Sequence, residues 1–286
     1  MLDAAGVREV EHLLRATADR EIRPWFGRLT AADVTEKAPG DLVTVADRGA
    51  EQALTDKLLA LLPASVVVGE EAVAHDPGRL EALDGDAPVW VLDPIDGTHN
   101  FVAGSPRFTT LLTLAQRGQL LASWTYAPEL DLMAVATAGG GAYVDGRRVR
   151  VGKAPDGLKF LDVSTVLPLW WSPRIRTGMN RLCRHGISMC FMDTAGLEYI
   201  ELASGRRTAM ISTWQLPWDH AAGILLLLEA GGVVMTRDGT SFRLAGGNAL
   251  PFVAAPDAAC ATALLAGMEP SGTEPRRLEP EHPPAA

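Results

Sequence analysis

The sequence lacks the features that mark membrane-spanning, secreted and disulfide-stabilised proteins. Its longest apolar run, Ala221 to Leu228, is too short to cross a bilayer. The start of the chain has no basic segment followed by an apolar segment, so we do not expect a secretory signal. The 3 cysteines show no CxxC spacing, which argues against a disulfide framework or a structural zinc site. We therefore expect a cytoplasmic protein that does not act at a membrane.

Positive charge is also scarce. The chain carries 26 lysines and arginines against 35 acidic residues, for a formal net charge of -9. Such a protein is not expected to bind nucleic acid or an anionic membrane, because phosphate backbones attract positive surfaces. A phosphorylated small molecule is still compatible with this charge, since carboxylates that collect divalent cations bind phosphate through those cations.

The composition is that of an ordinary globular protein. Apolar residues make up 47% and charged residues 21% of 286 residues, which favours one large domain or two packed lobes. Glycine-rich turns near the middle suggest an N-terminal lobe at 1–145 and a C-terminal lobe at 146–268. Residues 269–286 hold five prolines and almost no large apolar groups, so we expect a disordered tail there.

Hydrophobic periodicity predicts helices and strands in both halves, and hence a layered α+β fold. The expected helices are 6–22, 47–62, 196–204, 220–230 and 257–266, with another opened by Ser172-Pro173. The expected strands are 41–45, 65–68, 88–92, 109–114, 120–126 and 132–137, then 160–163, 186–190, 208–211, 233–235 and 251–254.

The segment VWVLDPIDGT (89–98) carries the strongest chemical signal. A buried strand delivers Asp93 to its carboxyl end, where α/β folds often place ligands, and Asp96 follows three residues later. Two carboxylates on a loop stiffened by Pro94 suit hard cations. Gly97 permits a turn, after which a short helix would aim its free amides at a phosphate. Taken alone, the segment is equally compatible with an Asp-rich turn that binds nothing.

Further carboxylates stand at comparable positions. Glu70 and Glu71 follow another strand candidate, and on an extended chain they would point to opposite sides. Asp219 stands at the start of a long apolar helix, where it is compatible with a simple N-cap. Asp41 and Asp47 are likewise compatible with turn and capping roles, and Glu70 and Glu71 with a solvated loop.

The combination of these motifs resembles the inositol monophosphatase family, within the superfamily of magnesium-dependent, lithium-sensitive phosphatases that includes fructose-1,6-bisphosphatases. The resemblance covers about residues 6 to 268 and rests on DLVTVAD (41–47), GEE (69–71), WVLDPIDGTHNF (90–101) and PWDHAAGILLLLEAGG (217–232). It implies a layered αβαβα sandwich, a phosphomonoesterase activity on a small phosphorylated metabolite, and a homodimer.

The resemblance also implies roles for particular residues. Two or three Mg²⁺ ions would be held by Glu70, Asp93, the Ile95 carbonyl, Asp96 and Asp219. Asp93 would bridge two ions. Glu70, Asp47 and Thr98 would form the catalytic group, in which Thr98, paired with Asp47, orients or deprotonates the attacking water. The amides of Gly97 and Thr98 would receive phosphate oxygens. In this chemistry one ion supplies the nucleophilic water and another stabilises the leaving oxygen.

Substrate choice is less determined. The candidate substrate contacts are Asp193, Thr194, Ala195 and Ser212. Asp193 stands where glycine is common in the family, Ser212 where inositol-specific members often carry Glu, and Ala103 where a polar or basic residue is usual. The favoured substrate is inositol monophosphate or a related sugar or polyol phosphate. The alternatives are fructose 1,6-bisphosphate, histidinol phosphate and 3'-phosphoadenosine 5'-phosphate, and a protein-binding regulator is the rival from another class.

A few other side chains have two interpretations. Trp170 and Trp171 either stack on a substrate ring or anchor a buried loop or dimer contact. Lys37 either approaches the phosphate, as a lysine before the DLVT segment does in relatives, or is an ordinary surface lysine. His99 and His220 are expected to be structural, because water activated by metal ions needs no histidine nucleophile.

Overall fold

The computed structural model describes residues 2–167 and 171–270. The predictions for Trp170 and for the tail beyond residue 270 therefore concern positions outside the described residues. Within the described residues no helix is both long and apolar enough to span a membrane.

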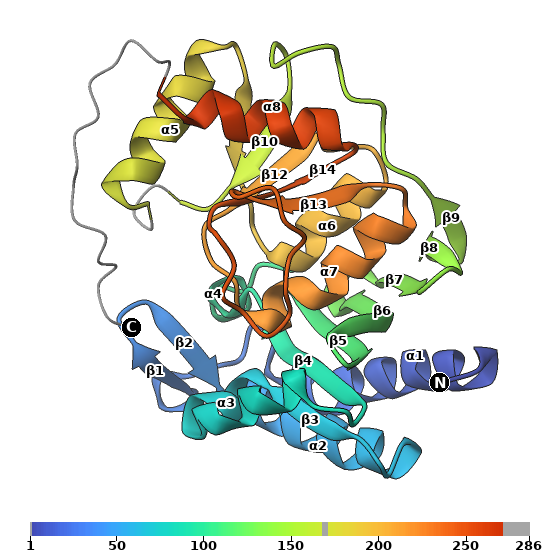
Figure 1. Cartoon of the computed structure of the whole chain (residues 1–286). Helices are drawn as coiled ribbons and strands as arrows, with labels where there is room; N and C mark the ends of the chain where they lie inside the picture. Colours follow the sequence, from blue (N-terminus) through green and yellow to red (C-terminus); the bar gives the residue numbers. More distant parts are fainter. Residues whose placement is uncertain (1, 168–170, 271–286) are drawn as a thin grey trace.

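The first sheet has seven strands in the order β3-β4-β5-β6-β7-β8-β9 (Figure 1). Their bounds are β3 Val66–Gly69, β4 Val89–Asp96, β5 Thr109–Gln116, β6 Gln119–Ala127, β7 Leu132–Thr137, β8 Gly141–Val144 and β9 Arg147–Val149. Strand β3 is parallel to β4, and every later pair is antiparallel. Strand β4 is buried on both faces, which explains its unbroken apolar sequence.

Side chains that alternate along β4 pack into different layers. Trp90 and Leu92 join a core with helices α1 (Ala4–Thr17) and α2 (Val45–Leu61) on one face. Val89 and Val91 face the other way, toward the first turns of helix α7 (Pro217–Glu229). This alternation is the period-two pattern of a pleated strand, and it places the strand between two helical layers.

The second sheet has five strands in the order β11-β10-β12-β14-β13. Their bounds are β10 Asp162–Thr165, β11 Ser188–Phe191, β12 Ala209–Ser212, β13 Val233–Thr236 and β14 Phe252–Ala255. Helices α6 (Ala195–Ala203) and α7 lie between the two sheets, while α5 (Pro173–Arg184) and α8 (Ala258–Met268) cover the outer face (Figure 1). The predicted αβαβα sandwich is confirmed.

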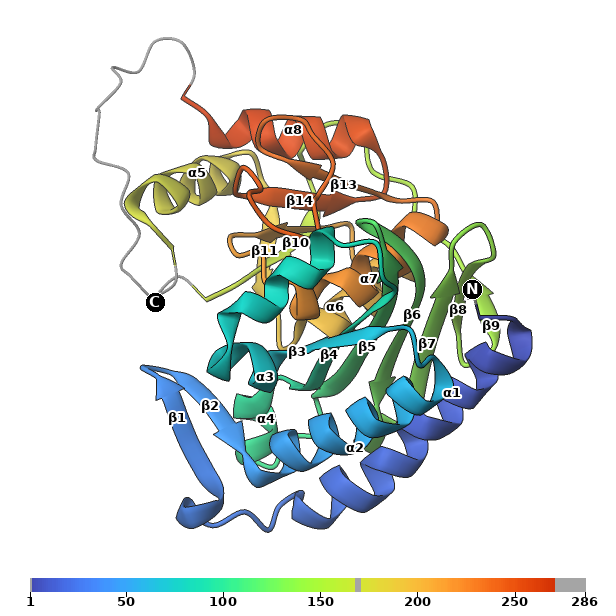
Figure 2. The same cartoon turned by 60° about the horizontal axis from the view of Figure 1, so that its bottom comes forward.

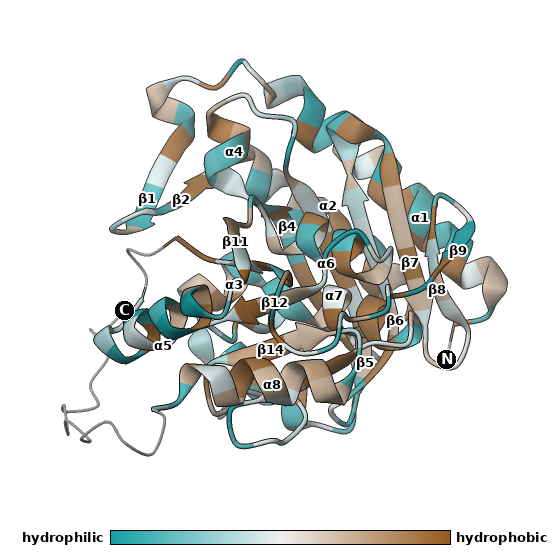
Figure 3. Cartoon of the chain, turned by 90° about the horizontal axis from the view of Figure 1, so that it is seen from above, coloured by the Kyte–Doolittle hydropathy of each residue, from teal (hydrophilic) through white to brown (hydrophobic). Residues whose placement is uncertain are grey.

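The two helices on the outer face differ in hydropathy. Helix α8 is largely hydrophobic, whereas α5 carries many hydrophilic residues (Figure 3). Because α6 and α7 pack against both sheets, the two predicted lobes share buried cores. The proposed lobe boundary near residue 145 stays a prediction.

Several local predictions were wrong or incomplete. Residues 34–38, for which no strand was predicted, form strand β1, which pairs with β2 (Asp41–Thr44) in a hairpin, although the half-exposed sequence VTEKA has no strand-like apolar pattern. Residues 70–75 form helix α3 and not a loop. Thr44, and not Asp47, caps α2, with Asp47 completing the capping box. Leu216 is the N-cap of α7, so Asp219 lies within its first turn.

The remaining helical segments are short. Helix α4 spans Thr98–Val102, a π-helical turn at Ala18–Ile22 extends α1, and 3₁₀ turns occupy Arg23–Trp25, Ala31–Asp33, Pro77–Asp84 and Pro128–Leu130.

The tight contact between α6 and α7 depends on Gly223. A Cβ atom there would lie 1.9 Å from Tyr199 Cδ2, in a ring that is fully buried. We expect Gly223→Ala to lower the free energy of unfolding by about 1–3 kcal/mol, the usual cost of overpacking a core, even though alanine favours helix. Urea denaturation measures the change.

Gly49→Ala is the matched control, since Gly49 also lies inside a helix but meets only the flexible Glu21 carboxylate, at 3.1 Å. There the helix propensity of alanine should dominate, with no loss or a gain of up to about 1 kcal/mol. Equal effects of the two substitutions would contradict the assigned packing.

Candidate active site

Four acidic residues gather where β3 and β4 end. The parallel register pairs Gly69 with Leu92, so Glu70 follows β3 beside Asp93 on β4. Asp96 closes β4, and Asp219 approaches from the first turn of α7. The negative charges of Glu70, Asp96 and Asp219 all act on Asp93, which is 2% exposed. The structure thus brings together the four carboxylates that the sequence motifs predicted.

This group carries more negative charge than its surroundings neutralise. Burial raises the pKa of Asp93 well above its ordinary value, and the neighbouring carboxylates raise it further. The pKa of Asp219 is also raised, by burial and then by the charges of Asp96 and Glu70. Like charges held together in a buried space are relieved by a bound cation, and an all-oxygen donor set is what Mg²⁺ prefers. The chemistry of this donor set therefore fits Mg²⁺.

Protein groups also hydrogen-bond these carboxylates. Asp96 Oδ2 accepts from Thr109 Oγ1 at 2.9 Å and from the Gly196 amide at 2.7 Å. Trp214 Nε1 donates to Asp219. In the part of the chain that the structure describes, no three His, Cys, Asp or Glu side chains form a ready-made group for one metal ion. The donors to Asp96 and Asp219 come from β5, α6 and the segment before α7, so several elements hold these two carboxylates.

Asp47 and Thr98 meet beside this group. Thr98 Oγ1 donates to the Ile95 carbonyl at 3.0 Å and lies 3.4 Å from Asp47 Oδ1. Burial raises the pKa of Asp47 to about 6, although hydrogen bonds from Thr44 act in the opposite direction. The pairing of Asp47 with Thr98 that the resemblance implied is present in the structure.

Gly97 makes the turn between β4 and helix α4. Its φ is +90°, in the left-handed region, and a Cβ atom there would lie 2.4 Å from Thr194 Cγ2. Both the conformation and the close contact require glycine. The turn starts α4 at Thr98, so the short helix that the sequence predicted after DPIDG is present.

Lys37 contacts the acidic group from the β1–β2 hairpin, which lies near α3 and α4 (Figure 2). Its ammonium group donates to Glu70 at 2.7 Å and to Glu71 at 2.9 Å. Burial acts to lower the pKa of Lys37, but the two carboxylates raise it overall. Because Glu70 and Glu71 begin a helix and both reach Lys37, the expectation that they point to opposite sides of an extended chain was wrong.

The four candidate substrate contacts lie at different depths. Asp193 is half exposed and accepts a hydrogen bond from Arg107 Nε at 2.5 Å. Thr194 caps α6, and the Ala195 amide points to Asp96 Oδ1 at 3.4 Å. Ser212 is 0% exposed, and its hydroxyl donates to the Trp214 carbonyl at 3.2 Å. Their contacts with a substrate stay predictions, and the burial of Ser212 makes it the least accessible of the set.

Both histidines of the motifs make structural contacts. His99 Nε2 lies 2.7 Å from the Gly40 carbonyl, joining α4 to the hairpin turn. His220 is fully buried among aromatic rings, 3.3 Å from the Tyr199 hydroxyl, and burial lowers its pKa to about 3. A neutral, enclosed imidazole of this kind serves packing.

Sequence reasoning missed three residues that shape the site. Arg107 had no recognisable signal, because its partner Asp193 lies 86 residues away in the chain. Trp214 lies only five residues before Asp219, but no periodic pattern predicts their contact. Glu51 did have a sequence signal. It follows Asp47 by four residues on α2, so both side chains occupy the same helix face.

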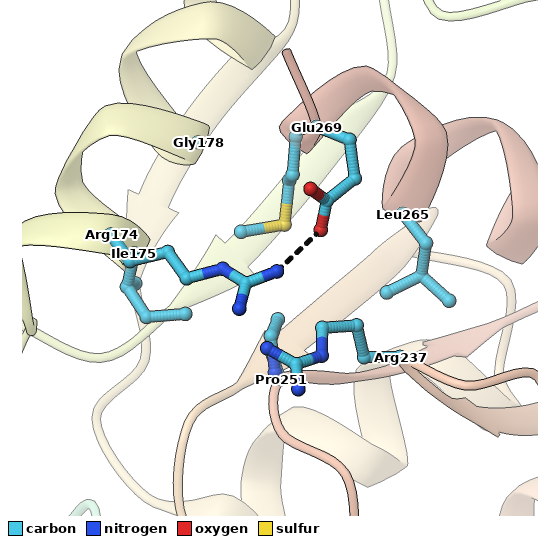
Figure 4. Close-up of a pocket in the computed structure, with 8 residues that line it drawn as sticks. Arg174, Ile175, Gly178, Arg237, Pro251, Leu265 and Glu269 are labelled. Atoms are coloured by element: carbon cyan, nitrogen blue, oxygen red, sulfur yellow. Dashed lines mark hydrogen bonds and ion pairs between the residues drawn. The ribbon is translucent and has the colours of Figure 1, made fainter. Parts of the chain in front are cut away.

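A separate small pocket lies between α5 and α8 (Figure 4). Arg174 spans it to Glu269, with a nitrogen–oxygen distance of 3.0 Å. Its volume of about 20 Å³ holds no more than a water molecule or so, and none of its lining residues belongs to the acidic group.

Comparison with known proteins agrees with the geometry. Residues 3–268 match the model of the inositol monophosphatase family. The chain belongs to this family. An inositol-1-monophosphatase from Mesorhizobium japonicum is 32% identical over 239 residues, which are 81% of this chain and 85% of that protein.

Two other relatives are informative. The Nus factor SuhB of Escherichia coli strain K12 is 31% identical over 221 residues, covering 76% of this chain and 80% of that protein. The crystal structure of the extragenic suppressor protein SuhB from Bartonella henselae superposes with a TM-score of 0.78 at 25% identity, covering 93% of this chain and 99% of that chain. Family membership thus includes proteins named for different roles.

The repulsion around Asp93 leads to a stability prediction. At pH 8 and without metal, Asp93→Asn should raise the melting temperature, because it replaces a buried carboxyl group, whose ionisation is disfavoured by burial and by like charges, with a neutral amide. Adding Mg²⁺ should stabilise the wild type by about 2.7 kcal/mol at a hundredfold excess over its dissociation constant, and should stabilise the variant far less. Differential scanning fluorimetry of both proteins, with and without Mg²⁺, measures the four values.

Asp131→Asn is a suitable control, since Asp131 is an exposed partner of Arg15 outside the acidic group. A metal-free Asp93→Asn protein that melts below the wild type would contradict the repulsion.

Proposed function

We propose that the protein is a Mg²⁺-dependent phosphatase that hydrolyses a phosphate monoester of a small metabolite. The observation that carries this proposal is the buried group of Glu70, Asp93, Asp96 and Asp219 beside the Asp47–Thr98 pair, in a chain of the inositol monophosphatase family. Buried carboxylates with raised pKa values at one point of a fold are typical of a functional site.

The Mg²⁺ ligands in this proposal are the four carboxylates and the Ile95 carbonyl. When bound, Mg²⁺ would neutralise charge on the phosphate and acidify a water molecule. Thr98 Oγ1 already hydrogen-bonds the Ile95 carbonyl, so its hydroxyl is held at the edge of the ligand set, where it orients the attacking water.

Asp47 would accept the proton that the attacking water loses, by way of Thr98: the Thr98 hydroxyl proton would turn from the Ile95 carbonyl to Asp47, and Thr98 Oγ1 would receive the proton from water. Asp47 Oδ1 lies 3.4 Å from Thr98 Oγ1, and the Asp47 pKa of about 6 suits a base that works near neutral pH. The amides of Gly97 and Thr98, at the start of α4, would receive phosphate oxygens.

The favoured substrate is inositol monophosphate or a related sugar or polyol phosphate. Arg107 neutralises Asp193 at the N-terminal end of α6, so this carboxylate does not repel an anionic substrate. The Arg107 guanidinium donates hydrogen bonds and the Asp193 carboxylate accepts them, so together the two side chains suit two neighbouring hydroxyl groups of a polyol substrate. Fructose 1,6-bisphosphate, histidinol phosphate and 3'-phosphoadenosine 5'-phosphate remain the alternatives with the same chemistry.

A regulator that binds other proteins is the second candidate function. It is favoured by the likeness to a protein named as a Nus factor, and would be the conclusion if a folded, metal-binding protein hydrolysed no phosphate ester. The homodimer and the cytoplasmic location stay predictions in either case.

Asp93→Asn should reduce kcat by about three orders of magnitude or more, because it removes the carboxylate charge that two bound cations would share. The measurement is phosphate release from inositol 1-phosphate and the alternative substrates, with Mg²⁺ and after treatment with a chelator. Millimolar Li⁺ should inhibit by competing for one cation position. Turnover that survives both the substitution and the chelator would refute the mechanism.

The Arg107–Asp193 pair leads to a prediction about substrate selection. Asp193→Asn and Arg107→Gln should each raise KM for inositol 1-phosphate severalfold, while the hydrolysis of p-nitrophenyl phosphate, which has no hydroxyls to contact the pair, should be unchanged. Each substitution removes one charge from an exposed ion pair, so stability should change by about 1 kcal/mol or less. An equal loss with both substrates would instead indicate a general disturbance of the site.

A further inference from the structure

Glu51 caps helix α3 from a distance. Its side chain extends from α2, is 7% exposed, and accepts hydrogen bonds from the amides of Glu71 and Ala72, both at 2.8 Å. These are the second and third amides of α3, which a side chain at the N-cap normally satisfies. The N-cap of α3 is Gly69, which has no side chain. Glu51 therefore supplies the missing cap from twenty residues earlier in the chain.

The junction between β3 and α3 lies directly against this carboxylate. A Cβ atom at Gly69 would approach Glu51 Cδ to 2.4 Å and both carboxylate oxygens to within 2.8 Å. A side chain at position 69 would displace the Glu51 carboxylate, so Gly69 leaves the space in which Glu51 reaches the start of α3.

That junction determines the position of Glu70. Glu70 is the first residue of α3, between the strand end at Gly69 and the two amides that Glu51 holds. Lys37, on the β1–β2 hairpin, donates to the Glu70 carboxylate at 2.7 Å, so the Glu70 side chain has a partner outside α3 and β4 as well.

We propose that Glu51 is a positioning residue that holds the start of α3 so that the Glu70 carboxylate stays beside Asp93 and can serve a metal ion there. This inference rests on the proposed function.

The helix face that carries Glu51 also carries Asp47, which belongs to the proposed catalytic pair. Asp47 lies one helical turn before Glu51 on α2 and contacts Thr98 at the start of α4. Helix α2 therefore sets the starts of α3 and α4 relative to each other, and a shift at Glu51 changes the geometry between the proposed metal ligands and the Asp47–Thr98 pair.

The alternative is that Glu51 only stabilises the fold, and the chain contains a matched residue for testing it. Glu229, at the end of α7, also accepts two backbone amides, from Gly139 at 2.7 Å and Gly141 at 2.8 Å. These amides lie at the turn between β7 and β8, and Glu229 is the last residue of the helix whose first turn carries Asp219. Glu229→Gln therefore removes a carboxylate that accepts two backbone amides, as Glu51 does, but at a place that holds no proposed metal ligand.

The experiment compares Glu51→Gln with Glu229→Gln in the full chain. Glutamine keeps the shape but presents an amide NH₂ to one of the two backbone donors. Both variants should melt at a lower temperature than the wild type. In isothermal titration calorimetry with Mg²⁺, Glu51→Gln should weaken binding by about tenfold or more, the usual effect of losing a group that orients a ligand. Glu229→Gln should bind Mg²⁺ like the wild type.

Kinetics give a second readout. Raising the Mg²⁺ concentration should restore most of kcat in Glu51→Gln, because every proposed ligand is still present. If this variant fails to fold, Gly69→Ala tests the same junction, since it displaces the Glu51 carboxylate without removing it, and it should weaken Mg²⁺ binding in the same way.

These measurements distinguish a failure of the positioning role from a failure of the proposed function. Wild-type Mg²⁺ affinity in Glu51→Gln or in Gly69→Ala would overturn the positioning role and leave the proposed function intact. A wild-type protein that binds no Mg²⁺ would overturn the proposed function, and the positioning role with it.

Discussion

Repulsion among buried carboxylates is the constraint on which this structure depends. Asp93 lies in an enclosed space with the charges of Glu70, Asp96 and Asp219 acting on it. Burial and like charge both disfavour ionisation, so such a group persists only where the surrounding fold holds it in place. The structure does this with donors from several elements, namely the Gly196 amide at Asp96, the Trp214 indole at Asp219 and the Lys37 ammonium at Glu70.

The layered architecture makes that arrangement rigid. Helices α6 and α7 lie between the two sheets, and the first turn of each lies beside the end of β4: the Gly196 amide of α6 donates to Asp96, and the charge of Asp219 on α7 acts on Asp93. One helix supplies the amides that bind Asp96, and the other supplies Asp219. Because both helices bury their side chains against both sheets, neither can shift without disturbing two cores. The position of the acidic group is therefore tied to the packing of the whole molecule.

Substrate selection rests on less rigid parts of the structure. Asp193 and Arg107 are half exposed and belong to loops at the ends of α6 and β5. Family membership covers relatives named as a phosphatase and as a Nus factor, so the shared fold does not define the reacting molecule. A fold carries a site, and the side chains around that site decide which ligand enters it.

What the sequence by itself determined was local. Asp93, Asp96, Gly97 and Thr98 lie within one strand and one turn, so their spacing was enough to predict a rigid acidic loop followed by a helix. The buried strands were predictable for the same reason, because the pattern of apolar residues is visible among neighbours in the chain. The αβαβα order of the layers was implied only by the resemblance to the inositol monophosphatase family.

Tertiary structure alone decided the rest. The Glu51 cap on α3 and the Arg107 pair with Asp193 join residues that are distant in the chain. Strand β1 and helix α3 were missed because their polar, half-exposed residues acquire structure from their neighbours: β1 from pairing with β2, and α3 from the Glu51 carboxylate at its first turn. Backbone preferences act over a few residues, whereas these contacts exist only once the layers are packed together.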